Sequence, residues 1–201
     1  MRILLISISF LLLGCASYPT KNGFVPTATI ERANINSYFS DTTKDYVYKA
    51  KIDAFDKNFG GILAIKKLGN MHHRLIFTTE MGNTIFDFTF KEEEFKVNKI
   101  LKDLDRKILI NILKRDFCAL ILENSKIDKI FQKESKTLKK VSILDKKHFY
   151  LSENGQLSKI SRTSNGKEKV VFSFSEINDD IAETIEIIHR NINLKIALSA
   201  I

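Results

Sequence analysis

Apolar and polar residues alternate along several stretches of this chain, and that alternation constrains the possible fold more than any other feature. Tyr46, Tyr48 and Ile52, for example, share one side of a period-two pattern. Such a period predicts a β-strand with one buried face and one solvated face. Turns that contain Gly or Asn separate the runs, which favours an antiparallel meander. The first five strands are expected near 46–53, 62–66, 74–79, 86–90 and 95–98.

Helical spacing replaces the alternation in the middle of the chain. Leu104, Ile108 and Ile112 lie four residues apart, and the apolar positions that follow repeat the stripe on a rotated face. Because the stripe rotates there, we expect two helices between 103 and 123, with Asp116 as N-cap of the second. A modest helical pattern predicts one more helix over 27–40.

Strand patterns resume after the helices. Asn154-Gly155 and Asn165-Gly166 each stand between two strand candidates, so they predict two tight hairpins. Counting all runs gives about ten strands with two helices inserted after the fifth. The later strands are expected near 148–151, 157–163, 169–175, 184–189 and 191–199.

The N-terminus reads as a secretory signal. An apolar run after Arg2 ends at small residues, and its roughly 11 residues are fewer than the roughly 20 of a spanning helix. Leu12-Leu13-Gly14-Cys15 resembles the lipobox of bacterial lipoproteins, whose cysteine is acylated, for example with palmitate, after cleavage just before it. We expect a signal peptide over 1–14, a lipidated N-terminus and tether over 15–26, and one domain over 27–201. Ordinary secretion, with Cys15 lost or free, is the alternative.

This resemblance also implies a location. Ala16, rather than Asp, follows the cysteine, which implies the outer membrane, with the domain facing the periplasm. Loss of Arg2 with the signal lowers the net charge from +8 to +7, which favours anionic lipid headgroups or acidic partners. The compartment argues against nucleic acid. Cys118 then stands alone, so no intramolecular disulfide can form; we expect a small buried hydrophobe rather than a reactive thiol.

The order of elements resembles the LolA/LolB family of lipoprotein carriers and receptors, especially the lipid-anchored LolB branch. Besides the architecture, the resemblance rests on the strand-Gly-strand segment RLIFTTEMGNTIFDF, residues 74–88. It implies a mostly β (α+β) fold: a strongly curved antiparallel sheet, or incomplete β-barrel, with inserted helices as a lid over an apolar cavity for acyl chains. LolB also has an exposed apolar loop residue. Leu68 and Met71, in the loop 67–72, are the candidates for membrane contact; a leucine folded back onto the sheet is the alternative.

An apolar cavity is also plausible on physical grounds, since a few short helices fill a wide curved sheet less fully than a second sheet would. Alternating aromatic residues equally suit a plain packed core. The candidate lining residues are Tyr48, Ile52, Leu63, Ile65, Leu75, Phe77, Phe86, Phe88, Phe172, Phe174, Leu194 and Ile196.

Groups that carry catalysis or hold metals are not evident in the sequence. His72 and His73 are adjacent, so a strand would point them to opposite faces, and no Cys or carboxylate stands at a zinc-like spacing. We expect them, like His148 and His189, to be surface residues. Residues 92–94, three glutamates, suit a solvated turn. Asp87, between Phe86 and Phe88, is expected on the wet face of its strand. No cofactor motif is recognisable.

Two hypotheses from different classes follow. The first is a monomeric, non-enzymatic carrier, anchored by lipid, that receives lipidated or other acyl cargo in an apolar cavity and helps deliver it to the outer membrane. The second is an envelope assembly or scaffold lipoprotein that binds a protein partner and whose cavity is filled. Uptake of an acyl ligand distinguishes them. An enzyme acting on envelope polymers is a distant third.

Overall fold

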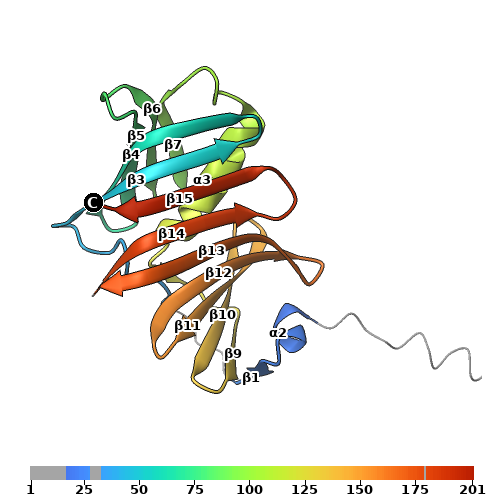
Figure 1. Cartoon of the computed structure of the whole chain (residues 1–201). Coiled ribbons are helices and arrows are strands. Elements are labelled where there is room, and N and C mark those ends of the chain that lie inside the picture. The colour runs from blue at the N-terminus through green and yellow to red at the C-terminus, as the bar shows by residue number, and fades with distance from the viewer. Residues whose placement is uncertain (1–16, 28–32, 179) are drawn as a thin grey trace, which may run out of the picture.

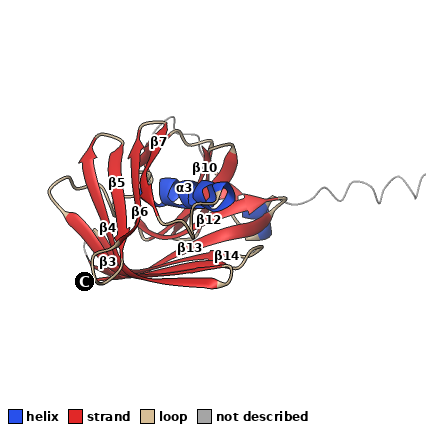
Figure 2. Ribbon diagram, turned by 90° about the horizontal axis from the view of Figure 1, so that it is seen from above, coloured by secondary structure: helices blue, strands red, loops and turns tan. Residues whose placement is uncertain are grey.

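The computed structural model describes residues 17–27, 33–178 and 180–201. One antiparallel sheet of thirteen strands dominates it and curves strongly without closing into a barrel (Figures 1 and 2). In spatial order its strands are β1 (Val25–Pro26), β9 (Lys129–Lys133), β10 (Lys136–Ile143), β11 (Lys146–Glu153), β12 (Gln156–Ser164), β13 (Lys167–Asn178), β14 (Ile181–His189), β15 (Leu194–Ala200), β3 (Asp45–Ala54), β4 (Lys57–Gly69), β5 (His72–Thr78), β6 (Thr84–Lys91) and β7 (Glu94–Ile100). Two short strands, β2 (Ala33–Asn34) and β8 (Asn124–Ser125), pair with each other.

The predicted strands on both sides of the helical region are confirmed. Both Asn-Gly pairs form the expected hairpins, and their four residues have positive φ, from 51° at Asn154 and Asn165 to 85° at Gly155. Positive φ at both central residues suits the right-handed twist of the flanking strands, which explains the preference for Asn-Gly. The last strand, β15, pairs with β3, so the C-terminal half of the chain continues the meander of the N-terminal half.

A single helix, α3 (Lys107–Ile121), lies in the concave side of the sheet (Figure 2), where the sequence pattern predicted two helices. Leu109, Leu113 and Phe117 are buried on one side, and Ala119 and Ile121 are buried as well. The apolar stripe therefore widens because the curved sheet surrounds the C-terminal half of α3, not because the helix breaks. Asp116 is inside the helix and is not an N-cap.

The helix predicted over 27–40 does not form in its described part. Residues 33–34 are β2, and residues 35–40, which we call the strap, cross the concave side without regular structure. Asn36 explains the difference: its Oδ1 accepts a bond from the Tyr38 N–H, and its Nδ2 donates to the carbonyl of Leu120. Such side-chain bonds to the backbone compete with a helix. Residues 28–32 lie outside the described residues.

The opposite, convex side carries a second apolar cluster. Phe131, Leu138 and Phe149 pack there under a short helix, α2 (Tyr18–Lys21), whose Tyr18 joins the cluster. Strands β9 and β10 were not anticipated, because with apolar residues on both faces they lack a clean alternation. Residues 17–26, expected as a tether, thus contact the sheet, and β1 pairs with β9 (Figure 1). Within the described ranges, no helix has the length and apolar character needed to cross a membrane.

Candidate functional site

The twelve residues predicted to line a cavity all lie on the concave side and are buried in the main core. The strap covers one part of them: Tyr38 lies 5.1 Å from Phe174, between ring centroids, and Phe39 lies 6.3 Å from Tyr48. Helix α3 covers another part, where its Phe117 lies 5.6 Å from Phe86. These twelve residues therefore form a packed surface beneath α3 and the strap.

A large cavity opens beside this core. It is a cleft of about 900 Å³ between the β6–β7 turn, α3, β8 and the β10–β11 turn. We call it the cleft. A smaller cavity of about 50 Å³ shares several of its lining residues and reaches inward to His73 and Glu123. The apolar lining of the cleft consists of Met71, Phe90, Phe95, Cys118, Leu122, Ile143 and Leu144.

Aromatic contacts connect the cleft with the core. Phe95, partly buried in the cleft wall, lies 5.0 Å from Phe90 and 5.3 Å from Phe88, between ring centroids. Phe88 in turn stacks on Phe86 at 4.4 Å with an angle of 9° between the rings. The cleft wall is thus the outer end of a continuous apolar layer. Sequence reasoning missed Phe95 as a site residue, although Phe95 and Val97 lie on the same half-buried face of β7.

Charged groups surround the apolar wall. Residues 92–94 form the exposed β6–β7 turn at the rim, as the sequence predicted for these glutamates. On the helix side, the Lys114 ammonium lies 5.3 Å from the centroid of the Phe95 ring. A charged rim around an apolar wall suits a ligand with an apolar chain and a polar head.

Cys118 faces this cleft from α3 and packs partly against the core. Burial raises the pKa of its thiol, and the nearby Lys114 opposes this shift only in part. The thiol is therefore protonated at neutral pH, which agrees with the predicted apolar role. Because it borders the cleft, it can also report on what occupies that space.

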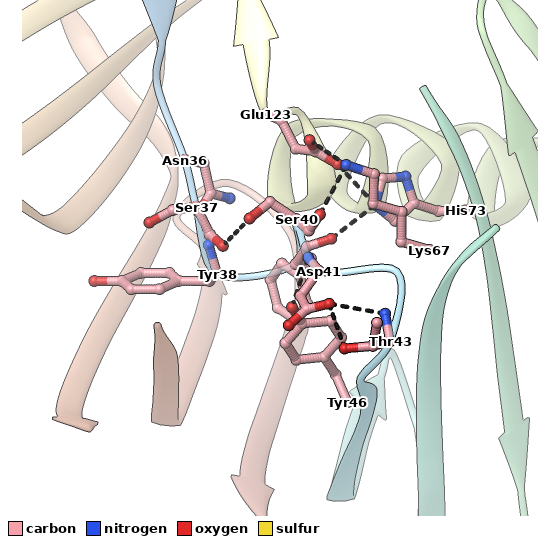
Figure 3. Close-up of polar contacts among 11 residues, drawn as sticks. Asn36, Ser37, Tyr38, Ser40, Asp41, Thr43, Tyr46, Lys67, His73 and Glu123 are labelled. Atoms are coloured by element: carbon pink, nitrogen blue, oxygen red, sulfur yellow. Dashed lines mark hydrogen bonds and ion pairs between the residues drawn. The ribbon is translucent and has the colours of Figure 1, made fainter. Parts of the chain in front are cut away.

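A polar network holds the strap (Figure 3), and its residues His73 and Glu123 line the small cavity at the inner end of the cleft. Lys67 of β4 donates to the Ser40 carbonyl at 2.8 Å and to Glu123 Oε2 at 2.7 Å. His73 of β5 donates through Nε2 to the Phe39 carbonyl at 3.0 Å, and Glu123 Oε1 lies 3.3 Å from the same nitrogen without a hydrogen bond. Burial lowers the pKa of His73, so the neutral ring with a proton on Nε2 fits this site.

The surface prediction for three histidines is wrong. His73, His148 and His189 are all buried, and only His72 is partly exposed. Burial lowers the pKa of His148 to about 4, and its Nδ1 bonds with the Lys146 carbonyl. His189 pairs with Asp116, 73 positions away in the sequence, which no local pattern could have indicated.

Asp87 lies on the face opposite Phe86 and Phe88, as predicted, but it is not solvated. Arg74 binds both of its carboxylate oxygens, at 3.0 and 2.6 Å, and Asn98 donates to it as well. The Arg74 side chain holds the pKa of this carboxyl below its usual value. The cross-strand pair therefore covers Asp87, which is only 8% exposed.

The two predicted membrane-contact residues are at the β4–β5 turn. Leu68 is half exposed, and Met71, with φ of 47°, is exposed beside the cleft. The structure thus brings Met71, but not Leu68, into the lining of the cleft. Among the described residues, no group of three or more His, Cys, Asp or Glu side chains is placed to hold a metal ion.

Comparison with known proteins shows the fold. No protein-family model matches the chain, and no curated protein matches it significantly. A solved structure of a LolA superfamily protein from Nitrosomonas europaea is similar, with 9% identity, a TM-score of 0.53, and coverage of 82% of this chain and 87% of that chain. A putative outer membrane lipoprotein-sorting protein domain from Vibrio parahaemolyticus has 8% identity and a TM-score of 0.43, over 82% and 86%. The first likeness shows a LolA-like fold, as the sequence resemblance predicted.

Proposed function

We propose that this protein is a lipid-anchored, non-enzymatic carrier that faces the periplasm, holds acyl chains of lipidated cargo in the cleft and helps deliver them to the outer membrane. The observation that carries the proposal is the cleft of about 900 Å³, whose apolar wall continues into the aromatic core. The LolA-like fold supports it.

Acyl chains fit this space for physical reasons. Each methylene that leaves water contributes about 0.8 kcal/mol, so a chain laid along Phe90, Phe95 and Leu122 gains affinity without any specific polar contact. The volume lies within the roughly 300–1,000 Å³ typical of ligand sites. We assign the twelve concave-side residues to a deeper part of the site, which a ligand reaches only after the strap or α3 has moved.

The N-terminus supports the anchor. The lipobox-like Leu12-Leu13-Gly14-Cys15 precedes Ser17, where the described structure begins, and Tyr18 is already packed on the sheet. Acylation at Cys15 would therefore hold the domain close to its membrane. We further propose that Leu68 and Met71, exposed at the β4–β5 turn, contact the bilayer when cargo is released.

The test uses Cys118 as a reporter. In a chain with Cys15→Ser, Cys118 is the only thiol, and a lipopeptide in the cleft should slow its alkylation. Native mass spectrometry of the same sample should show the bound lipopeptide. Cys118→Phe, which places a ring in the cleft, should abolish the bound mass, whereas Met81→Phe at the exposed β5–β6 turn should not.

The opposite result has a clear meaning. A ligand-free monomer whose Cys118 is alkylated at the same rate with and without lipopeptide would reject the carrier function and favour the scaffold hypothesis.

A further inference from the structure

Positive charge is concentrated in one part of the chain. Residues 126–169, which run from just before β9 into β13, contain twelve lysines and arginines against five acidic residues. That segment therefore carries a net charge of +7, whereas the whole chain carries +8. An asymmetry of this size indicates that one side of the molecule meets an anionic partner.

The same segment forms a second large cavity, on the convex side. This cavity, which we call the basic groove, has a volume of about 800 Å³ and lies between α2 and strands β9 to β12. Phe131 and Phe149 contribute an aromatic floor, and the ring of Tyr18 lies 4.9 Å from that of Phe149. The Tyr18 hydroxyl donates to Glu168 at 2.8 Å, so α2 is fixed against the sheet.

Four lysines and one aspartate line the basic groove with Arg162. Lys140 is paired with Asp128 at 3.3 Å, and Lys129 lies 5.7 Å from the centroid of the Phe131 ring. Lys146 and Lys147, at the start of β11, are exposed and form no ion pair with any described residue. These two ammonium groups are available to an external anion.

The position of the basic groove identifies the source of that anion. Ser17 lines the groove, and Cys15 is only two residues before it. Two extended residues span at most about 7 Å, so an acylated Cys15 would hold the groove at the membrane surface. A protein fixed at that distance meets lipid phosphates at high local concentration, and each lysine near an anionic surface adds to its attraction.

We propose that the basic groove binds the phosphate headgroup of an anionic phospholipid in the membrane that carries the anchor. The aromatic floor lies beneath the headgroup, and Lys146 and Lys147 contact its phosphate. Which membrane the groove meets depends on the proposed anchor, but headgroup binding itself is a property of the folded domain. Headgroup binding sets the orientation in which the cleft meets the bilayer.

Vesicle binding of the mature chain, residues 15–201 with Cys15→Ser, tests this, because the apolar run of the signal peptide would itself insert into vesicles. The protein should partition onto phosphatidylcholine vesicles that contain phosphatidylglycerol and not onto vesicles of pure phosphatidylcholine. Added salt should weaken this binding. Lys146→Gln together with Lys147→Gln should weaken partitioning roughly 30-fold, which corresponds to about 1 kcal/mol per lysine. The control is Lys49→Gln with Lys51→Gln on β3, which removes the same charge from exposed sites and should have little effect.

Three outcomes would overturn the proposal. The protein could bind both kinds of vesicle equally, or the two double variants could lose the same amount of vesicle binding. In the third, inorganic phosphate would displace the protein from the vesicles more than chloride does at equal ionic strength. The last would indicate a free-anion site. Failure of the carrier function is distinguishable, because it would remove the lipopeptide effect on Cys118 and leave vesicle binding intact. The mass of the N-terminal peptide from the unsubstituted chain reports separately on acylation of Cys15.

Discussion

Asp116 of α3 and His189 of β14 form a buried hydrogen bond, with 2.7 Å between Oδ2 and Nε2. Both side chains are at most 2% exposed. Asp116 also interacts with Arg162 of β12. Burial lowers the pKa of Arg162, and the negative charge of Asp116 partly offsets that shift. The inserted helix is thus tied to the C-terminal half of the sheet by one carboxylate among several basic groups.

Removal of that carboxylate should be costly. In Asp116→Ala, His189 loses its buried hydrogen-bond partner and Arg162 loses a nearby negative charge, so we expect the free energy of unfolding to fall by roughly 3–5 kcal/mol. Urea unfolding measures it, and a double-mutant cycle with His189→Gln isolates the pair. If the two single losses simply add, the pair is not coupled and this account of how α3 is held is wrong.

The sequence predicts this fold best where the cause is local. Asn154-Gly155 needs only its own backbone preference, and the alternation on β3 needs only one buried face. The strap could not be predicted, because Asn36 prevents a helix by binding the carbonyl of Leu120, far along the chain. The buried histidines were missed for the same reason. The cleft wall was found only in part, since Phe95 and Cys118 acquire their role from the curvature of the sheet.

His148 predicts how stability depends on pH. Its pKa falls from the model-peptide 6.5 to about 4 in the fold, mainly through burial. Between these values the unfolded chain binds the proton and the native protein does not, so stability falls as the pH drops from 6.5 towards 4. We expect a loss of about 3 kcal/mol across that window. His148→Gln, followed by urea unfolding at several pH values, should flatten this slope; an unchanged slope would assign the effect to other groups.

Gly61 of β4 is required by a close backbone approach. A Cβ at this position would lie 1.8 Å from the Thr78 carbonyl oxygen on β5, whereas one at neighbouring Gly60 would meet nothing within 4 Å. Gly61→Ala should therefore push β4 and β5 apart and lower the thermal midpoint, with a cost of roughly 1–3 kcal/mol. Gly60→Ala is the matched control and should be neutral or slightly stabilising. Equal midpoints for the two variants would mean that the strands separate without cost at Gly61.

Glu123 should control how firmly the strap closes the core. It accepts a bond from Lys67 at 2.7 Å in a place where both side chains are less than 15% exposed, and Lys67 also holds the Ser40 carbonyl. Glu123→Gln removes the charge, and we expect about 1–3 kcal/mol less protection of the strap. Hydrogen exchange of peptides over 35–40 should accelerate, while peptides from β13 should not change.

The exposed pair Lys136–Glu153 provides a matched comparison. Its atoms lie 2.9 Å apart, but both side chains are about 40% exposed, so solvent screens the attraction. Glu153→Gln should leave exchange in the strap unaltered. Alkylation of Cys118 should also be faster in Glu123→Gln, because the inner end of the cleft loosens with the strap. Faster strap exchange without faster alkylation would show that the strap opens away from the cleft, and the deeper part of the site would then need a different route.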